Sequence, residues 1–238
     1  MDKNQQGQLA LAGLFICIGL MLAGLFLKKG IENFKAMDRV VTVKGLSEKE
    51  VKADRVIWPL MYKEIGDDLI TLNSTVTIKN EAIVSYLTSH GLTPEEITVS
   101  APEIVDMKAE RYSNTPVTYR YNVTSVVTVA SSKVDLVRNL MNNQNVLIKQ
   151  GIAITSEDYS NQKQFLFTRL NQIKPGMIQE ATQNARASAL KFAQDSESKL
   201  GKIKTADQGQ FSITDRDANT PYIKSVRVVT TICYYLED

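Results

Sequence analysis

The chain has 238 residues, with 28 lysines and arginines against 26 aspartates and glutamates. Its formal net charge of +2 argues against a strongly basic nucleic-acid binder and against an acidic disordered protein. Two cysteines and one histidine are too few for a disulfide scaffold, a cysteine-built zinc site or a histidine cluster. We therefore expect no cofactor and no metal site.

The strongest pattern is the uncharged, proline-free run from Leu9 to Leu27. At about 1.5 Å per helical residue, its length matches the hydrocarbon core of a bilayer. It continues directly into Lys28 and Lys29 rather than into a small-residue cleavage site, which favours an uncleaved anchor over a cleaved signal peptide. The expected organisation is a tail over residues 1–8, a transmembrane anchor over 9–27 and a connector over 28–37.

The charges that flank this run bear on the side of the membrane that holds the large domain. Four cations follow it, whereas Lys3 alone precedes it and is offset by Asp2. The positive-inside rule, taken alone, places the domain in the cytoplasm. Gly19 and Ala23 have the spacing that lets two membrane helices pack closely, although a plain lipid-facing helix is the simpler interpretation.

After residue 38, β-branched and alternating segments bounded by turn residues predict strands. They are Val40–Lys44, Val51–Ile65, Ile97–Arg111, Val117–Ala130, Ile152–Asp158, Lys163–Arg169, Ile203–Thr214 and Tyr222–Leu236. Pro59 within the second suggests an edge strand or a bulge. Consecutive strands are expected to pair as antiparallel hairpins, with connections that include residues 45–49 and 113–116.

Helices are predicted where apolar residues recur at helical spacing between capping residues. They are a helix from about Asp68 to His90, one turn after Thr93–Pro94, a helix from Ser132 to Gln150 and one from Pro175 to Leu200. Asp67 is the expected N-cap of the first. Glycines are expected to end the three long helices: Gly91, Gly151 and Gly201. The last helix carries a stripe that predicts close packing: Met177, Ala181, Ala185, Ala189 and Ala193.

The order strand, strand, helix recurs three times and closes on a strand pair. It predicts an α+β fold of antiparallel sheets with helices on one face, preceded by one N-terminal transmembrane helix. The α+β domain is expected over residues 38–238, and a division into two lobes near residue 150 is one alternative.

Several stretches resemble the SIMPL-domain family, also called domain of unknown function 541, which includes a periplasmic immunogenic outer-membrane protein. The resemblance is carried by Asp38–Asp54, Ile57–Pro59, Glu180–Ala193, Leu200–Ile203, Gln208–Ile213 and Pro221–Val229. The N-terminal anchor looks like that of the membrane-tethered branch.

The resemblance implies a bacterial envelope location, an α+β fold and assembly into large homo-oligomers with a channel or cage shape. It also implies a loose link to oxidative-stress protection, and it supplies no agreed catalytic site. It places the domain on the periplasmic side of the inner membrane, against the charge count. We follow the resemblance, because large domains are translocated despite flanking charge.

Two polar features of the sequence could bind a metal ion, and each also has a simpler structural interpretation. His90 ends a predicted helix, where a surface or capping role is favoured over a metal-ligand role. Asp215–Asn219 has the pattern that starts a calcium loop. Thr220 stands where that loop needs glycine, and Val226 where it needs glutamate, so we expect a polar hairpin tip.

The two cysteines are not expected to pair, because Cys17 falls in the membrane segment and Cys233 in the last strand. Cys233 has no nearby base or second cysteine in a redox spacing, so a buried apolar thiol is favoured. No phosphate loop, dinucleotide fingerprint or nucleophile elbow occurs in the sequence.

Trp58 and Pro59 form the candidate partner interface. A tryptophan beside a proline on an edge strand suits an interface anchor, and core packing is the alternative. The long predicted hairpins would leave strand edges that neighbouring subunits can seal.

Three functional hypotheses follow. The first is a membrane-anchored, non-catalytic envelope protein that self-assembles into a homo-oligomeric ring or cage and binds no nucleic acid. The second is a ligand- or protein-binding sensor module on the membrane surface. The third is a carboxylate hydrolase that uses Glu103 and Asp106, which is disfavoured because this spacing on a strand puts the two side chains on opposite faces. We therefore expect no catalytic residues.

Overall fold

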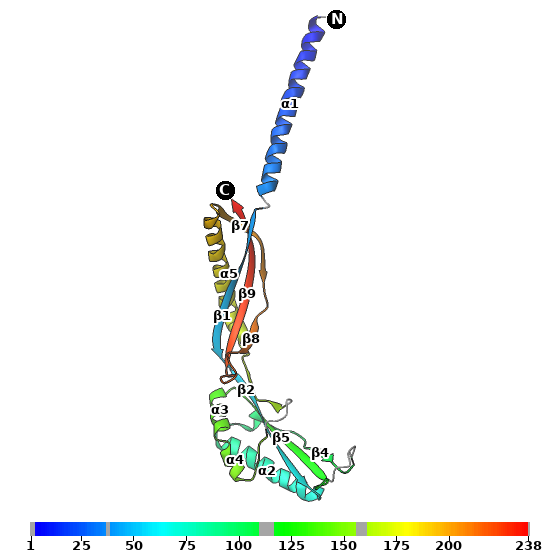
Figure 1. Cartoon of the computed structure of the whole chain (residues 1–238), viewed down its shortest axis with the longest axis vertical. Helices are drawn as coiled ribbons and strands as arrows, with labels where there is room; N and C mark the ends of the chain where they lie inside the picture. Colours follow the sequence, from blue (N-terminus) through cyan, green and yellow to red (C-terminus); the bar gives the residue numbers. More distant parts are fainter. Residues whose placement is uncertain (1–2, 37–38, 110–116, 156–160, 238) are drawn as a thin grey trace. The chain divides into compact units, whose positions relative to one another are not determined.

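The computed structural model describes residues 3–36, 39–109, 117–155 and 161–237 (Figure 1). Its helices are α1 (Lys3–Ala36), α2 (Leu69–Ser89), the 3-10 turn η1 (Pro94–Glu96), α3 (Val134–Asn142), α4 (Asn145–Lys149) and α5 (Leu170–Asp195). Its strands are β1 (Val40–Lys52), β2 (Arg55–Gly66), β3 (Ile97–Val99), β4 (Glu103–Asp106), β5 (Tyr121–Ser131), β6 (Gln164–Leu166), β7 (Lys199–Gln208), β8 (Ser212–Asp215) and β9 (Ile223–Glu237). The predicted α+β class with antiparallel sheets and one N-terminal apolar helix is confirmed.

The chain forms two compact units, each assembled from separate stretches. The first unit contains Met1–Lys49, Lys174–Ser212 and Arg227–Asp238, and the second contains Glu50–Ile173 and Ile213–Val226. Residue 150, near which the sequence suggested a division, lies inside the second unit. The units interleave in the sequence because long-range strand pairing, rather than chain order, decides which stretches pack together.

The first unit packs α5 against strands β1 and β9 of the sheet with strand order β1-β9-β7 (Figure 1). Side chains alternate along β1, so that Val43 and Ser47 are buried while their neighbours are exposed. All five members of the predicted small-residue stripe of α5 are buried. The core contains Val43, Ala185, Ala189, Ile232 and Tyr234.

Gly45 explains why β1 runs through residues 45–49, where a turn was predicted. A Cβ atom on Gly45 would lie 1.9 Å from the carbonyl oxygen of Ala181 and 2.4 Å from the backbone nitrogen of Ala185. This glycine therefore allows α5 to approach the strand rather than reversing the chain. The prediction of a turn here was wrong.

The outer edge of β1 is the end of its sheet within the described part of the chain. Leu236 donates its backbone N–H to the carbonyl of Arg39 at 2.8 Å, so the backbone of Arg39 faces β9. Backbone groups alternate between the two edges of a strand, so those of Thr42 and Lys44 face outward. On this edge, Asn184 Nδ2 donates to the carbonyl of Leu46 at 2.8 Å.

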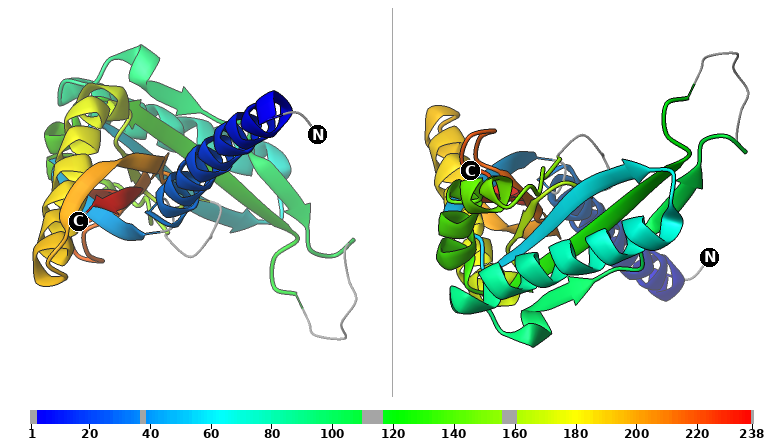
Figure 2. Two further views of the ribbon diagram at one scale, coloured as in Figure 1. Left: turned by 90° about the horizontal axis from the view of Figure 1, so that it is seen from above. Right: turned by 90° about the horizontal axis from the view of Figure 1, so that it is seen from below.

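The second unit is built on a sheet in which β5 and β2 are central, β6 pairs with β2, and β3 and β4 both pair with β5. The register of β2 and β5 is continuous from Val56↔Ser131 to Gly66↔Tyr121. Helix α2 lies along one face of this sheet (Figure 2). Alternate residues of β2 point into the core between them: Val56, Trp58, Leu60 and Tyr62.

Helix α2 begins at Leu69, one residue later than predicted. The carboxylate of Asp68, not of Asp67, accepts the N–H of Thr71 at 3.1 Å, while Asp67 accepts the N–H of Arg120 at 3.0 Å. Either aspartate fits the local pattern, and the contact with a distant strand decides between them. Gly91 follows the helix with φ +97°, as its predicted end requires.

The helix predicted from Ser132 to Gln150 is two helices, α3 and α4, interrupted at Asn143 and Gln144. The N-cap position of α3 is occupied by Lys133, not Ser132. The N–H of Lys133 donates a hydrogen bond to Ser131 Oγ at 2.9 Å. A capping-box pattern does not specify such a break, so the prediction of one helix was wrong.

The predicted start of the last helix, Pro175, lies five residues after its true start, and its predicted end was also wrong. Helix α5 starts at Leu170, so Pro175 lies inside it, and it ends at Asp195 before Glu197 with φ +54°. Gly201, its predicted end, lies within β7. A non-glycine residue in the left-handed region gives no sequence signal of this kind.

The predicted antiparallel pairing of Ile97–Arg111 with Val117–Ala130 is confirmed, but the first partner is two strands, β3 and β4, each paired with β5. The connection predicted at 113–116 lies outside the described residues. Two other predicted strand pairs were wrong. Strands β1 and β2 do not pair, because β1 neighbours β9 and β2 lies between β5 and β6 in the other sheet. Strand β6 pairs with β2, and Thr155 forms an isolated bridge with Met61, so the stretches 152–155 and 163–169 meet β2 rather than each other. The final pair, β7 with β9, is confirmed.

Candidate functional site

Trp58 and Pro59 lie next to each other on β2 but in different surroundings. The side chain of Trp58 is 5% exposed and packs in the core of the second unit. Pro59 is half-buried on the other face of the strand. Trp58 therefore has the core packing given as the alternative at the sequence level, and Pro59 contributes the more accessible surface.

Pro59 faces an edge of β2 that β6 does not cover. The carbonyl of Met61 accepts the N–H of Thr155 at 2.7 Å on this edge, and the backbone of Pro59, two residues earlier, points the same way. Strand β6 pairs only with Arg55–Ile57. Proline has no N–H to leave unpaired here, and the register through Pro59↔Thr128 has no bulge.

A cavity of about 650 Å³ opens beside these two residues. The apolar part of its wall comes from Trp58, Pro59, Met141, Ile154 and Pro221. The polar part is mostly carboxamide: Asn142, Gln144, Asn161 and Gln162, with Thr155 and Lys163. The described lining residues can hydrogen-bond the backbone of a peptide or another neutral polar ligand, and none of these described residues carries a carboxylate or an imidazole.

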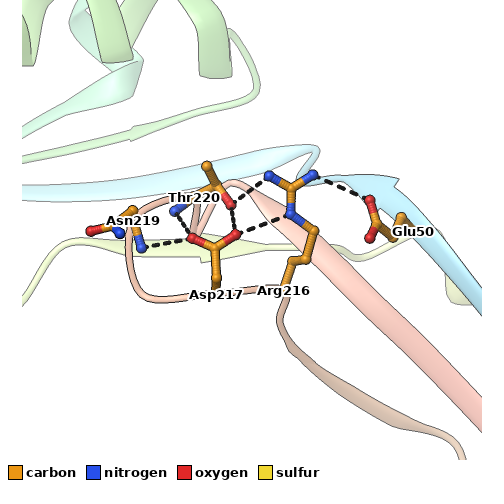
Figure 3. A network of polar contacts seen from close by, with 5 residues as sticks. All are labelled: Glu50, Arg216, Asp217, Asn219 and Thr220. Atoms are coloured by element: carbon orange, nitrogen blue, oxygen red, sulfur yellow. Dashed lines mark hydrogen bonds and ion pairs between the residues drawn. The ribbon is translucent and has the colours of Figure 1, made fainter.

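The Asp215–Thr220 turn is the polar hairpin tip that the sequence predicted (Figure 3). The carboxylate of Asp217 accepts a hydrogen bond from Nε of Arg216 at 3.0 Å. It accepts further hydrogen bonds from the backbone N–H groups of Asn219 and Thr220, both at 2.8 Å. It also accepts the hydroxyl of Thr220, and this bond, followed by the one from Arg216, lowers the pKa of Asp217 to about 2. The carboxylate is thus engaged within its own turn.

The rest of this turn is held by ion pairs. Arg216 Nη1 lies 3.3 Å from Glu50 Oε2, and Asp215 pairs with Lys224 (Figure 3 shows the pair with Glu50). Across residues 3–36, 39–109, 117–155 and 161–237, no group of three or more histidine, cysteine or acidic side chains is arranged to hold a metal ion.

Two of the remaining candidates of the sequence analysis, His90 and Asp106, also have structural partners. Nδ1 of His90 lies 2.7 Å from the carbonyl of Tyr86, at the C-cap of α2. The carboxylate of Asp106 pairs with Arg120 at 2.9 Å, which lowers its pKa, and Glu103 is exposed on the same strand. Cys233 is half-buried and, like Cys17, a free thiol.

Sequence reasoning missed a carboxylate that organises the second unit. Asp54 accepts the backbone N–H groups of Thr168 and Arg169 at 2.9 and 3.1 Å, and Nε of Arg169 at 3.0 Å. Burial disfavours its ionised form, but these bonds outweigh burial and lower the pKa of Asp54. Its partners are more than 110 residues away, so no local pattern identifies it.

Comparison with known proteins identifies the family of the chain. The family model of SIMPL, described as a protein of unknown function (DUF541), matches residues 41–229. The chain therefore belongs to the SIMPL family, and an apolar helix precedes the family domain. A search of curated proteins finds no match.

One helix in the described part of the chain is long and apolar enough to cross a membrane. Its segment Gly13–Gly30 has a mean hydropathy of 1.7, and none of it is buried in the structure. Length and composition are the basis of this assignment, and they fit the anchor expected over residues 9–27.

Proposed function

We propose that the protein is a membrane-anchored, non-catalytic component of the bacterial cell envelope whose domain, on the periplasmic side of the inner membrane, assembles into a homo-oligomeric ring or cage. The observation that carries the self-association is the open edge of β1. The family resemblance adds a contribution to stress protection as the expected physiological role.

The anchor is supported by the exposure of its apolar side chains. Leu20, Met21 and Phe26 are each more than two-thirds exposed, in a segment without charge. Each apolar side chain of this kind gains roughly 0.3–0.6 kcal/mol on insertion at the centre of a bilayer. A run this long is poorly tolerated in water.

Self-association is supported by the contrast between the two end strands of the first unit. Strand β7 has an irregular register near Ile203, a feature that discourages pairing with another strand. Strand β1 begins with the β-branched run Val40–Val43, and the backbone N–H and C=O groups of alternate residues point toward its free edge. A second copy can continue the sheet there.

Light scattering after size-exclusion chromatography of the full chain in detergent tests this proposal. The parent protein is expected to be a homo-oligomer. Thr42→Pro removes an outward N–H and fits an edge strand, so it should shift the mass toward the monomer. Thr42→Val keeps the N–H and should retain the oligomer, with circular dichroism as the check on folding. A strictly monomeric parent at high concentration, or a Thr42→Pro oligomer like the parent's, contradicts it.

The second candidate function is binding of a polar ligand or a client protein at the Trp58–Pro59 cavity, which the carboxamide-rich wall favours. Gln144→Trp should fill this cavity. If the β1 edge carries assembly, the mass of Gln144→Trp stays that of the parent. Loss of the oligomer in Gln144→Trp but not in Thr42→Pro would instead make Trp58 and Pro59 the subunit interface.

A further inference from the structure

One end of the first unit gathers the start of β1 and the last turns of α5. The helix runs antiparallel to the strand, because Ser47 bonds Glu180 at 2.7 Å while Val43 packs with Ala189, further along the helix. Arg39 then bonds Ser198 at 2.9 Å, just past the helix. We call this region the Arg39 end.

Chain length keeps the Arg39 end close to any bilayer that holds the anchor. From Gly30, the last residue of the apolar segment, to Ala36 the helix rises about 9 Å. From Ala36 to Val40 the chain spans at most about 15 Å. The headgroup layer itself is several ångströms thick, so the Arg39 end lies within reach of it.

Aromatic side chains concentrate at this end. The described residues of the first unit, leaving out α1, contain four aromatic side chains: Phe192, Phe211, Tyr234 and Tyr235. Phe192 is 59% exposed on the last turns of α5, and Tyr235 lies near the end of β9 with Lys204 Nζ 5.4 Å from its ring centre. Aromatic rings beside cations are typical of the membrane–water interface.

Of the four aromatic side chains, one lies at the opposite end of the unit. Phe211 lies there, with Lys174 Nζ 5.7 Å from its ring centre. Lys174 precedes Phe192 by 18 residues of the same helix, which is about 27 Å. The two phenylalanines therefore mark two ends of one unit.

Charges at the Arg39 end are compatible with lipid phosphates. The exposed Lys191 precedes Phe192 in α5, and among the described residues of this end outside α1 the cations outnumber the acidic side chains. The cations are Arg39, Lys191, Lys199, Lys202 and Lys204, and the acids are Asp195, Glu197 and Glu237. A small excess of positive charge near a surface favours anionic headgroups.

We propose that the Arg39 end is a second membrane contact, which rests on the headgroup layer of the bilayer with the ring of Phe192 at the interface and Lys191 beside lipid phosphates. This inference rests on the proposed anchor in the membrane. It adds a surface of the folded domain to that anchor, and so fixes which end of the first unit faces lipid.

The test uses the full chain in nanodiscs of phosphatidylcholine and phosphatidylglycerol, with and without lipids that carry a spin label near the headgroup. Trp58 is the only tryptophan and lies in the core of the second unit, so its emission is the background. F192W should show added emission that the spin label reduces by about twofold. The added emission of the matched variant F211W should be unaffected.

The outcomes separate this inference from the proposed function. A chain that does not enter nanodiscs contradicts the anchor. A chain that enters them while F192W and F211W respond alike overturns the lipid contact alone. If F192W does not fold, L190W reports from the same turn of α5, where Leu190 is 42% exposed. In F192W, adding Lys191→Glu should weaken the quenching, and unchanged quenching would remove Lys191 from the contact.

Discussion

Gly45 is the residue on which the packing of the first unit depends most directly. Gly45→Ala places a Cβ against the backbone of Ala181 and Ala185, which cannot move as a side-chain tip can. We expect it to destabilise the protein by about 1–3 kcal/mol, the range typical of overpacking. The midpoint of urea unfolding measures the loss.

Gly176→Ala is the matched control. Gly176 lies in α5 with no atom within 4 Å of an added Cβ, so alanine there should be neutral or stabilise the helix by up to about 1 kcal/mol. Equal effects of the two substitutions would mean that the close approach at Gly45 is not a constraint.

Glu96 links stability to pH through three polar partners. It accepts the hydroxyl of Ser131 at 2.6 Å, the N–H of Thr93 at 2.9 Å and Nζ of Lys133 at 3.0 Å. Burial opposes its ionisation, but these partners outweigh burial and lower its pKa from 4.5 to about 2. Because the folded-state pKa is the lower one, the stability from Glu96 is complete above pH 4.5 and is lost as the pH falls toward 2.

Glu96→Gln should therefore unfold more easily at neutral pH and lose less further stability between pH 4.5 and 2 than the parent. Glu103→Gln, on an exposed position of β4, should follow the parent curve. Unfolding midpoints over this pH range give the comparison. A Glu96→Gln curve parallel to that of the parent would show that the three contacts do not stabilise the carboxylate.

At the scale of elements, Asp54 determines how the chain enters α5. Its side chain is 7% exposed and accepts two backbone N–H groups just before the helix begins at Leu170. Asp54→Ala leaves those groups without their acceptor and should cost about 2 kcal/mol. Asp54→Asn keeps one acceptor oxygen and should cost less. Indistinguishable unfolding midpoints for the two variants would contradict this role.

The elements that sequence predicts best are those with a strong local period. The alanine stripe of α5 and the end of α2 before Gly91 belong to this group, since each depends on residues within a few turns. The interruption between α3 and α4, and the choice of Asp68 over Asp67, were not predictable in this way. The choice between the aspartates depends on a contact with a segment distant in sequence, the bond from Arg120 to Asp67.

The candidate interface was predictable only in part. Periodicity identified β2, and proline placed Pro59 at an edge. It did not show that Trp58 points into the core, because strand direction is fixed only once the partner strand and its register are known. Nor did it show the carboxamides that line the cavity, Asn142 and Gln144 around the end of α3 and Asn161 and Gln162 before β6.

For the whole molecule, membrane sidedness can be measured directly. The flanking charges and the family resemblance predict opposite sides, and we expect the periplasmic side. Protease added to intact spheroplasts should then digest the domain while a cytoplasmic marker survives. A domain that is protected until the spheroplasts are lysed would support the charge count instead.

For the whole molecule, the sequence predicted the α+β fold class and the N-terminal apolar helix, because composition and hydropathy are summed over many residues. It did not predict the two interleaved units. Strand β1 neighbours β9, which follows it by about 170 residues, and no local pattern identifies such a partner.

The stripe of α5 also bears on how the helix keeps its place along the sheet. Alanines recur every fourth residue from Ala181 to Ala193, so sliding the helix by one repeat, about 6 Å, would set alanine where alanine was. Apolar shape alone therefore leaves several nearly equivalent alignments. The bonds Ser47–Glu180 and Asn184–Leu46 select one of them, so two hydrogen bonds, rather than the hydrophobic contact, set the register of helix on strand.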